Sequence, residues 1–436
     1  MTTQRSAARV LRRSGALAGV AMSSALLLSA CGSGDTASSD AVQLTVWTWS
    51  NEAATAFEDG ILDVFEEAHP DIDVEVVAQL DENYETLLTT GLAGSGSPDI
   101  VALRSYGVLN SFAESGNITP VDDVVEDWDG FSEAALAGAR GKDDGQLYAV
   151  PQGIQTAQVY YNKEIFADLG LDVPSSWEDF LDAARRIDEA GIAPIVIPGA
   201  VAAQISLGAE VIGNARRGAG EFEQAFVAGE KTLTDPDNVA AVELMEQIQP
   251  YLVDDVTSVT LDEAVTLFAT GQAAMFPSGT WQVTTFANLG MEIDYGTFDV
   301  PAGQDWPSGA VTVSYADGGW ALAERSEHPD EAAVLLNWLA GAEFAGLYTN
   351  AMGTIPARDG VSLENPLLAE MYERYQSTPS TYLGAAYLRY GSPSGTDLLG
   401  EQVQKLWLGQ ATPDGVAESV QTGIDAWFDP ADFQHE

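Results

Sequence analysis

The sequence predicts an α/β protein with an open sheet built from βαβ units. Patterns typical of strands and helices alternate from Gln43 onward, and such alternation indicates strands joined by crossover helices. The chain has 436 residues, of which 46% are apolar. This length and composition are sufficient for two or three domains with full-sized hydrophobic cores.

Hydrophobic periodicity predicts the elements in order. Gln43–Thr48 alternates apolar and polar side chains, which is typical of a half-buried strand. Glu52–His69 places its large apolar residues on one helical face and ends before Pro70. The same reasoning predicts strands at Asp73–Val77, Asp99–Leu103, Gln158–Tyr161 and Pro194–Ile197, and helices at Asn83–Leu92, Lys163–Leu169, Trp177–Ala190, 238–252, 260–270, 329–340, 366–376 and 400–408.

The amino terminus has the features of a secretory signal. Four Arg residues and no acidic residue precede an apolar stretch, Ala16–Leu28, which is short for a membrane span. The following Leu28-Ser29-Ala30-Cys31 resembles a bacterial lipobox, in which the Cys is lipidated and becomes the first residue. We therefore expect residues 1–30 to be a signal peptide and 31–42 to be a lipidated Cys31 with a flexible tether. An ordinary signal peptide with an incidental Cys is the alternative.

These features predict an extracytoplasmic lipoprotein anchored to the outer face of the cytoplasmic membrane. No later apolar stretch reaches the roughly 18 residues that a membrane-spanning helix needs. The lipid on Cys31 would thus be the contact with the membrane.

Composition excludes several classes of protein. The chain has 66 Asp and Glu against 18 Lys and Arg, a formal charge of −48, so a nucleic-acid partner is not expected. Removal of residues 1–30 would take away four Arg and leave −52. One Cys and three His exclude a disulfide framework, a thiolate metal site and a His-rich metal site. We expect neither a metal nor a cofactor, although sites made only of carboxylates stay open.

The sequence does not predict an enzyme. It contains no G-x-S-x-G elbow, P-loop, dinucleotide fingerprint or H-E-x-x-H motif. Glycoside hydrolysis needs only two carboxylates, so a surface carbohydrate-active hydrolase remains an alternative of another class.

Several phrases, in order and spacing, resemble the extracellular solute-binding proteins (family 1, sugar type) of bacterial ABC importers. The resemblance covers residues 43–436, and phrases in register are more specific than any one motif. The phrases are Leu44–Ser50 (LTVWTWS), Ser97–Ile100 (SPDI), Tyr148–Lys163 (YAVPQGIQTAQVYYNK), Trp177–Phe180 (WEDF), Gly271–Trp281 (GQAAMFPSGTW), Gly318–Trp320 (GGW) and Met352–Pro356 (MGTIP).

The resemblance implies a two-lobed, periplasmic-binding-protein-like (type II) fold with a ligand cleft between lobes joined by hinge crossings. Lobe 1 would comprise residues 43–153 plus 315–354, and lobe 2 residues 154–314 plus 355–436. The crossings would lie near Gln152–Ala157, within Pro301–Asp317 and near Thr354–Arg358.

The resemblance also implies a function. A monomeric receptor would capture a carbohydrate, a di- or oligosaccharide, and deliver it to the transmembrane subunits of an ABC permease, whose separate ATPase subunits hydrolyse ATP. The same fold could instead bind a sugar phosphate or a glycerol-phosphate-type anion, or act with a signalling partner.

Sugars present apolar faces ringed by hydroxyl groups, so a site needs flat aromatic rings and planar polar groups. Core packing is the alternative for each Trp, and Asn83 beside Tyr84 could instead cap a helix. The expected ligand-binding residues are Trp47, Trp49, Tyr84, Arg104, Ser105, Gln155, Trp281, Gly318, Gly319, Trp320 and Arg389. The two glycines would let a ligand approach the backbone.

Overall fold

The computed structural model describes residues 41–79, 84–94 and 96–433. The described residues from Ala41 onward form one compact unit. The expected signal peptide, the lipobox with Cys31 and Asn83 therefore lie outside the described residues. Within the described residues, no helix has both the length and the apolar character needed to cross a membrane.

The first part of the chain forms the predicted βαβ units. Strand β1 (Val42–Thr48) pairs in parallel with β2 (Ile72–Ala78) on one side and with β3 (Ile100–Arg104) on the other. Helix α3 (Tyr84–Ala93) precedes β3, and α4 (Gly107–Glu114) follows it. The predicted helix 52–69 is divided into α1 (Asn51–Ala56), a π-helical turn η1 (Phe57–Ile61) and α2 (Leu62–Ala68). The division falls at Gly60, whose φ of 130° is not helical.

Two long antiparallel strands form the centre of the sheet. They are β5 (Val150–Asn162) and β9 (Thr312–Ala323), and the strand order is β2-β1-β3-β9-β5-β7-β6. β5 also pairs with β7 (Ala273–Gly279) and β8 (Tyr295–Phe298), and β7 pairs in parallel with β6 (Ala193–Ile195). The sheet is thus mixed, and the prediction from βαβ units described only its parallel parts.

One edge of β9 has two partners in succession. β10 (Pro379–Thr381) pairs with the beginning of β9 as far as Ser314, and β3 pairs with it from Gly318 onward. β4 (Ile118–Thr119) pairs with the end of β9. Residues 315–317 of β9 therefore lie between the strand partners on this edge.

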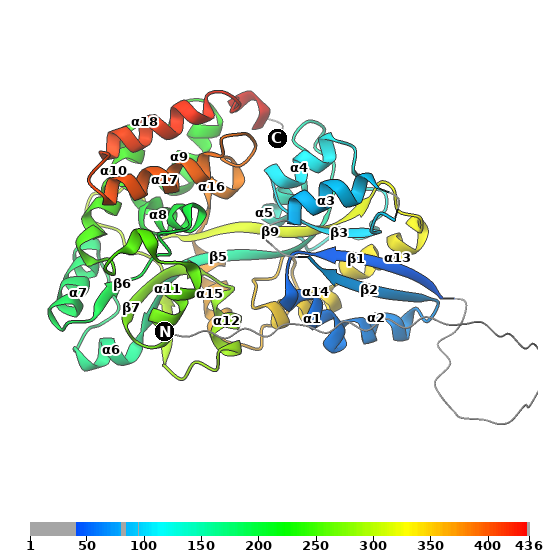
Figure 1. Cartoon of the computed structure of the whole chain (residues 1–436), viewed down its shortest axis with the longest axis horizontal. Coiled ribbons are helices and arrows are strands. Elements are labelled where there is room, and N and C mark those ends of the chain that lie inside the picture. The colour runs from blue at the N-terminus through cyan, green and yellow to red at the C-terminus, as the bar shows by residue number, and fades with distance from the viewer. Residues whose placement is uncertain (1–40, 80–83, 95, 434–436) are drawn as a thin grey trace, which may run out of the picture. The chain divides into compact units, whose positions relative to one another are not determined.

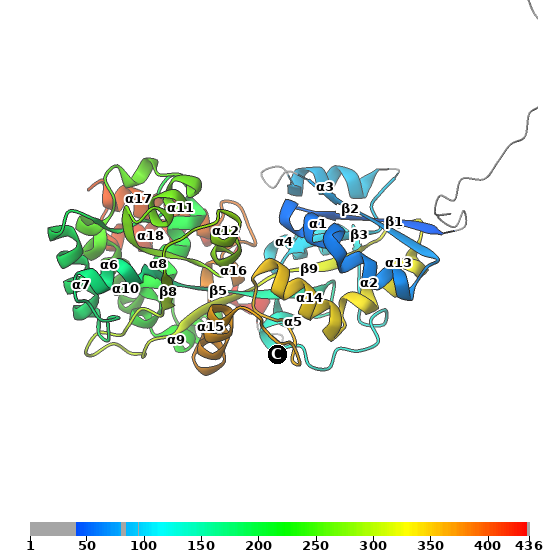
Figure 2. The same ribbon diagram turned by 90° about the horizontal axis from the view of Figure 1, so that it is seen from below.

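Helices cover the sheet in two groups, which Figures 1 and 2 show joined by β5 and β9. We call these groups the N-terminal half (blue, cyan and yellow) and the C-terminal half (green, orange and red). Most of the predicted helices are confirmed within a few residues. The remaining helices are α5 (Glu133–Ala139), α6 (Lys163–Asp168), α7 (Trp177–Glu189), α8 (Ala202–Arg217), α9 (Ala219–Val227), α10 (Pro236–Ile248), α11 (Leu261–Ala269), α12 (Gln282–Asn288), α13 (Pro329–Leu339), α14 (Ala342–Met352), α15 (Pro366–Ser377), α16 (Leu383–Ala386), α17 (Gly395–Trp407) and α18 (Pro413–Ile424), with the 3-10 turns η3 (Gln249–Tyr251), η4 (Val256–Ser258) and η5 (Pro430–Phe433).

Each half has a hydrophobic core of its own, and a third cluster joins the two halves, since it contains Tyr106 and Ala135 together with Phe268 and Phe276. The first core contains residues between Leu44 and Val150 together with residues between Trp320 and Tyr348. The second contains residues between Ala157 and Val313 together with residues between Tyr382 and Val416. Because β5 and β9 pass from one core to the other, the residues where they cross are held by both halves.

Candidate functional site

A cluster of polar side chains, called the polar group below, lies where the paired strands β5 and β9 run from one half into the other. The Nε2 atom of Gln155 donates a hydrogen bond to Oδ2 of Asp317 at 3.0 Å, and Nε2 of Gln152 lies 3.4 Å from the same oxygen. The Oε1 atom of Gln155 accepts from the hydroxyl of Thr280, which follows β7. Gln155 therefore connects a carboxylate on β9 to the end of β7.

Asp317 is the charged centre of this group. Its residue is half-buried, and burial raises the pKa of its carboxyl group above the ordinary value of 3.8. The amide donor of Gln155, the charge of Arg104 and the amide of Gln152 act in the opposite direction and lower that pKa. A carboxylate offers about four lone-pair directions, so two amide donors leave it able to accept further hydrogen bonds.

Trp49 and Arg104 lie next to this carboxylate on the N-terminal half. The guanidinium carbon of Arg104 lies 4.8 Å from the ring centroid of Trp49, a cation–π distance. A Cβ atom added at Gly318 would lie 2.8 Å from Cη2 of Trp49 and 3.1 Å from Nε2 of Gln152. Four predicted site residues, Trp49, Arg104, Gln155 and Gly318, are thus brought together around Asp317.

Tyr84 supports this arrangement from within the protein. Its hydroxyl lies 2.7 Å from the carbonyl oxygen of Ala102 and 3.0 Å from that of Trp47, and its ring meets Trp49 edge to face. Only 3% of the residue is exposed, and burial raises the pKa of its hydroxyl. The expectation that Tyr84 contacts a ligand is therefore corrected, because the hydroxyl joins β1 to β3 and the ring backs Trp49.

Trp47 lies on β1, two residues before Trp49, but its ring packs in a different place. It is half-buried against the first core, and a Cβ added at Gly91 of α3 would lie 2.5 Å from its ring. The structure thus places Trp47 against α3, whereas Trp49 lies beside the polar group.

Trp320 differs from its prediction. It is 0% exposed and belongs to the first core, where its ring meets Phe57 at 5.4 Å and Tyr348 at 5.8 Å between centroids. A side chain enclosed by other rings cannot stack on a ligand without repacking of the core. The prediction failed because an apolar strand after two glycines has the same pattern in a core and in a cleft.

The glycines before Trp320 are required by the protein's own packing. A Cβ at Gly318 would lie 2.5 Å from the carbonyl oxygen of Leu103, and one at Gly319 would lie 2.7 Å from Cβ of Ala149. At Gly319 the close neighbours are protein atoms rather than open space, so the expectation of ligand approach there is corrected.

The C-terminal half contributes an aromatic and cationic group. The ring of Tyr315 meets that of Tyr382 edge to face at 5.6 Å, and the guanidinium carbon of Arg389 lies 5.8 Å from the Tyr382 ring. Tyr315 is the register partner of Gln155. Burial raises the pKa of the Tyr315 hydroxyl, the charge of Asp317 raises it further, and Arg389 and Arg104 lower it. Two arginines, one from each half, therefore lower the pKa of one tyrosine beside Asp317.

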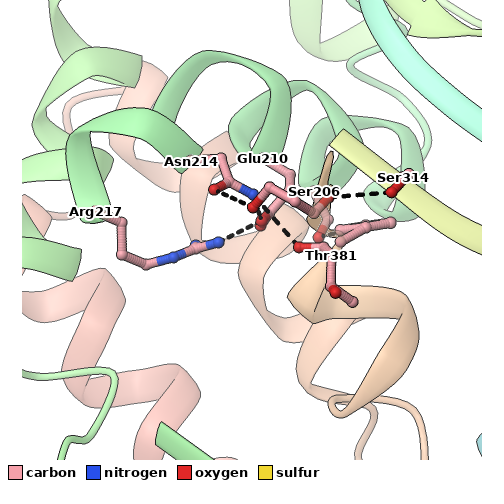
Figure 3. A network of polar contacts seen from close by, with 8 residues as sticks. Ser206, Glu210, Asn214, Arg217, Ser314 and Thr381 are labelled. Atoms are coloured by element: carbon pink, nitrogen blue, oxygen red, sulfur yellow. Dashed lines mark hydrogen bonds and ion pairs between the residues drawn. The ribbon is translucent and has the colours of Figure 1, made fainter. Parts of the chain in front are cut away.

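A buried network of polar contacts joins α8 to β10 (Figure 3), and one of its members, Ser206, also holds Tyr382 in place. Ser206, Glu210, Asn214 and Arg217 lie along one face of α8, with Arg217 paired to Glu210. Nδ2 of Asn214 donates to Glu210 at 2.6 Å, and its Oδ1 accepts from Ser380 at 3.0 Å. The hydroxyl of Tyr382 donates to Ser206 at 2.9 Å. The network thus fixes β10 and the side chain of Tyr382, and the guanidinium group of Arg389 lies over the Tyr382 ring.

Trp281 and Ser105 lie at the margin of the polar group. Trp281 is half-buried at the start of α12, packs against the second core, and covers Gly279 so closely that a Cβ there would overlap its ring. Its neighbour Thr280 bonds Gln155. The Oγ atom of Ser105 would lie 2.9 Å from a Cβ at Gly138, so this side chain packs on α5.

Sequence reasoning missed Asp317, Gln152, Thr280, Tyr315 and Tyr382. The available signal was position, because Asp317 directly precedes the Gly318-Gly319 phrase and Gln152 lies in the first predicted crossing. In a chain with 66 acidic residues, one carboxylate does not stand out. Within the part of the chain that the structure describes, no three His, Cys, Asp or Glu side chains are grouped so as to hold a metal ion.

Two α/β halves joined by crossing strands, with a polar group at the crossing, define the class of two-lobed binding proteins. The family described as "Bacterial extracellular solute-binding protein" matches residues 48–345. The chain belongs to this family.

Curated relatives and solved structures agree with this assignment. The chain is 25% identical to the "Diacetylchitobiose binding protein DasA" of Streptomyces coelicolor over 73% of this chain and 74% of the relative. It is 24% identical to the "Multiple sugar-binding protein" of Streptococcus mutans over 79% of this chain and 82% of the relative. Its fold is similar to that of a "Chitin oligosaccharide binding protein", with a TM-score of 0.74, 22% identity, and coverage of 88% of this chain and 98% of the other.

Proposed function

We propose that this protein captures a carbohydrate, a di- or oligosaccharide, between its two halves and delivers it to an ABC permease. The observation that carries the proposal is Asp317, which two glutamine amides hold beside Trp49 and Arg104 where the halves join. A carboxylate accepts hydrogen bonds from sugar hydroxyls, an arginine donates to them, and an aromatic ring packs on the apolar sugar face. The names of the relatives and of the similar structure, which refer to sugars, support the same ligand class.

In this proposal the lobes are residues 43–153 plus 315–354 and residues 154–314 plus 355–436. The two cores divide the chain in a similar way. The register of β5 against β9 shifts on both sides of Gly153, and β5 meets residue 355 through the Ile154–Ile355 bridge. A shift in register marks a place where a strand bends, so it suits a hinge at 152–157.

Delivery would follow from closure of the lobes over the sugar, since a permease can distinguish the closed form from the open one. The protein would do no chemistry on the sugar and would act as a monomer. After removal of residues 1–30, the lipid on Cys31 would hold it at the outer face of the cytoplasmic membrane. ATP hydrolysis would belong to separate subunits of the importer.

A second ligand class has one observation in its favour. Arg104 lies over Trp49 and Arg389 lies over Tyr382, and two arginines are suited to a sugar phosphate or a glycerol-phosphate-type anion. However, Asp317 would repel such an anion at short range, and the acidic protein would repel it at long range. A neutral sugar therefore fits the group better.

A thermal-shift screen of residues 41–436 tests the ligand class directly. The compounds are neutral oligosaccharides, sugar phosphates and sugar acids. Ligand at 100 times its dissociation constant stabilises the folded state by about 2.7 kcal/mol. A shift with neutral oligosaccharides alone would support the proposal, and a shift with phosphorylated compounds alone would replace it by the anion. Chromatography of the sugar after incubation would detect cleavage, and cleavage would favour the hydrolase.

A further inference from the structure

One lysine of the N-terminal half is held by the end of the described chain. Lys142 lies in the turn between α5 and β5, and its Nζ atom is 2.7 Å from Oδ2 of Asp432 in η5. The side chains are only 20% and 37% exposed, so water and salt screen this pair less than a surface pair.

The backbone of Lys142 is fixed within the N-terminal half. Its N–H donates to Oδ1 of Asn110 on α4 at 2.6 Å. Nδ2 of Asn110 in turn donates to the carbonyl oxygens of Tyr106 and Arg140, at 3.0 Å and 3.2 Å. The ammonium group therefore extends from a rigid turn, which lowers the entropy that the ion pair must offset.

Asp432 and its neighbour belong to the C-terminal half. The ring of Phe433 packs against Tyr387, Tyr390 and Phe428, with centroids 5.1–5.4 Å apart. Phe428 stacks on Phe226 of α9 at 4.6 Å. These ring contacts anchor η5 to the helices of the C-terminal half.

Lys142 also contacts two of the aromatic rings that surround η5. Its Nζ atom lies 5.9 Å from the ring centroids of both Tyr390 and Phe433, within the range of cation–π contacts. The chain has only four Lys among 66 acidic residues, so an acidic neighbour alone would mean little. Two rings and an anchored backbone make this contact specific.

The segment between Tyr387 and Phe433 touches α4 directly as well. A Cβ added at Gly107, the first residue of α4, would lie 2.5 Å from the carbonyl oxygen of Arg389 and 3.0 Å from Cα of Tyr390. The backbone that carries Arg389 therefore rests on the N-terminal half, while its guanidinium group lies over Tyr382.

We propose that Lys142, Asp432 and Phe433 form a tie between the two halves. The tie holds the segment that carries Arg389 against α4 and fixes the separation of the halves. Lys142 is thus a positioning residue that acts on Arg389 through Tyr390. The inference goes beyond carbohydrate capture and does not require that the ligand be a sugar.

Distances between spin labels test the tie without any ligand. Residues 41–436 contain no Cys, so Asp63→Cys on α2 and Glu178→Cys on α7, both exposed, give one label on each half. We expect a narrow distance distribution for the parent and a broader one for Lys142→Met, which keeps the length of the apolar stem. The charge swap Lys142→Asp with Asp432→Lys should narrow the distribution again.

An ion pair within one half provides the matched control. Lys163 bonds Asp294 at 3.0 Å in the C-terminal half, and Lys163→Met should leave the distribution unchanged. Amide exchange at residues 107–110 should accelerate in Lys142→Met and not in Lys163→Met. An unchanged distribution in Lys142→Met or equal broadening in both variants would overturn the tie. If Lys142→Met does not fold, Asp432→Asn makes the same comparison from the other side.

Discussion

The guanidinium group of Arg104 lies 4.8 Å from the ring of Trp49, and the two residues stand at the ends of neighbouring parallel strands. β1 and β3 are in register at Trp47 and Val101, so both chains leave the sheet at the same edge. The parallel register therefore brings a flat ring and a planar cation together beside Asp317. This edge is where open α/β sheets place their ligands.

Replacing Trp49 should reduce affinity rather than stability. Trp49→Ala removes the ring beside Asp317, and we expect the dissociation constant for the sugar found in the screen to rise more than tenfold, or about 1.4 kcal/mol. Isothermal titration calorimetry measures this change. Trp47→Ala is the matched control, because that ring packs on Gly91 of α3; it should lower the melting temperature and leave affinity within about threefold. Equal affinity losses in the two variants would contradict the assignment.

Replacing Asp317 should weaken sugar binding as well. Asp317→Asn removes a charged acceptor, and hydrogen bonds to charged groups contribute about 1.5–3 kcal/mol, so we expect a loss of roughly 10- to 100-fold. Asp99→Asn is a matched control, since Asp99 accepts from the Thr45 N–H at 2.9 Å and from Ser326 at 2.6 Å within the N-terminal half. It should destabilise the fold and spare affinity. If Asp317→Asn bound the sugar as tightly as the parent protein, the carboxylate of Asp317 would not be part of the binding site.

The raised pKa of Asp317 predicts the direction of a pH effect. Burial raises the pKa above 3.8, so above that pH the unfolded chain binds fewer protons than the native one. The free energy of unfolding therefore falls as pH rises through the native pKa. Asp317→Asn removes this titration, and its melting temperature relative to the parent should increase between about pH 4 and pH 7. If the difference in melting temperature between Asp317→Asn and the parent stayed constant or decreased with pH, burial would not raise the pKa of this carboxyl group.

Much of the fold could be predicted because its first elements are amphipathic. β1, β2 and the helices between them have one buried face, and their periodicity is visible in the sequence. The ends of the central strand β5 could not be predicted from the sequence. Every residue from Val150 to Tyr160 is buried, so apolar and polar side chains do not alternate along it. Helix α8 was missed for the same reason, since residues on nearly all its faces are buried.

The candidate site could be predicted only in part. Trp49, Arg104 and Gln155 follow or lie in strands, and position alone indicated them. Sequence could not distinguish Trp320 in the core from Trp49 beside the polar group, because each lies in or next to a strand and the sequence does not show which side chains cover it. Burial and the partners of each side chain depend on contacts between distant segments, such as Gln155 with Asp317, that local patterns do not contain.

Gly318 should tolerate no side chain, because two elements of the site converge on it. In Gly318→Ala the Cβ would lie 2.5 Å from the carbonyl oxygen of Leu103 and 2.8 Å from Trp49. Overpacking of this kind costs about 1–3 kcal/mol, so the melting temperature should fall and sugar affinity should fall with it as Trp49 moves. Gly346 lies in α14 with no atom within 4 Å of an added Cβ, and Gly346→Ala should be stabilising by up to about 1 kcal/mol. If Gly318→Ala were as stable as the parent and bound sugar equally well, Trp49 would not be held against β9 in solution.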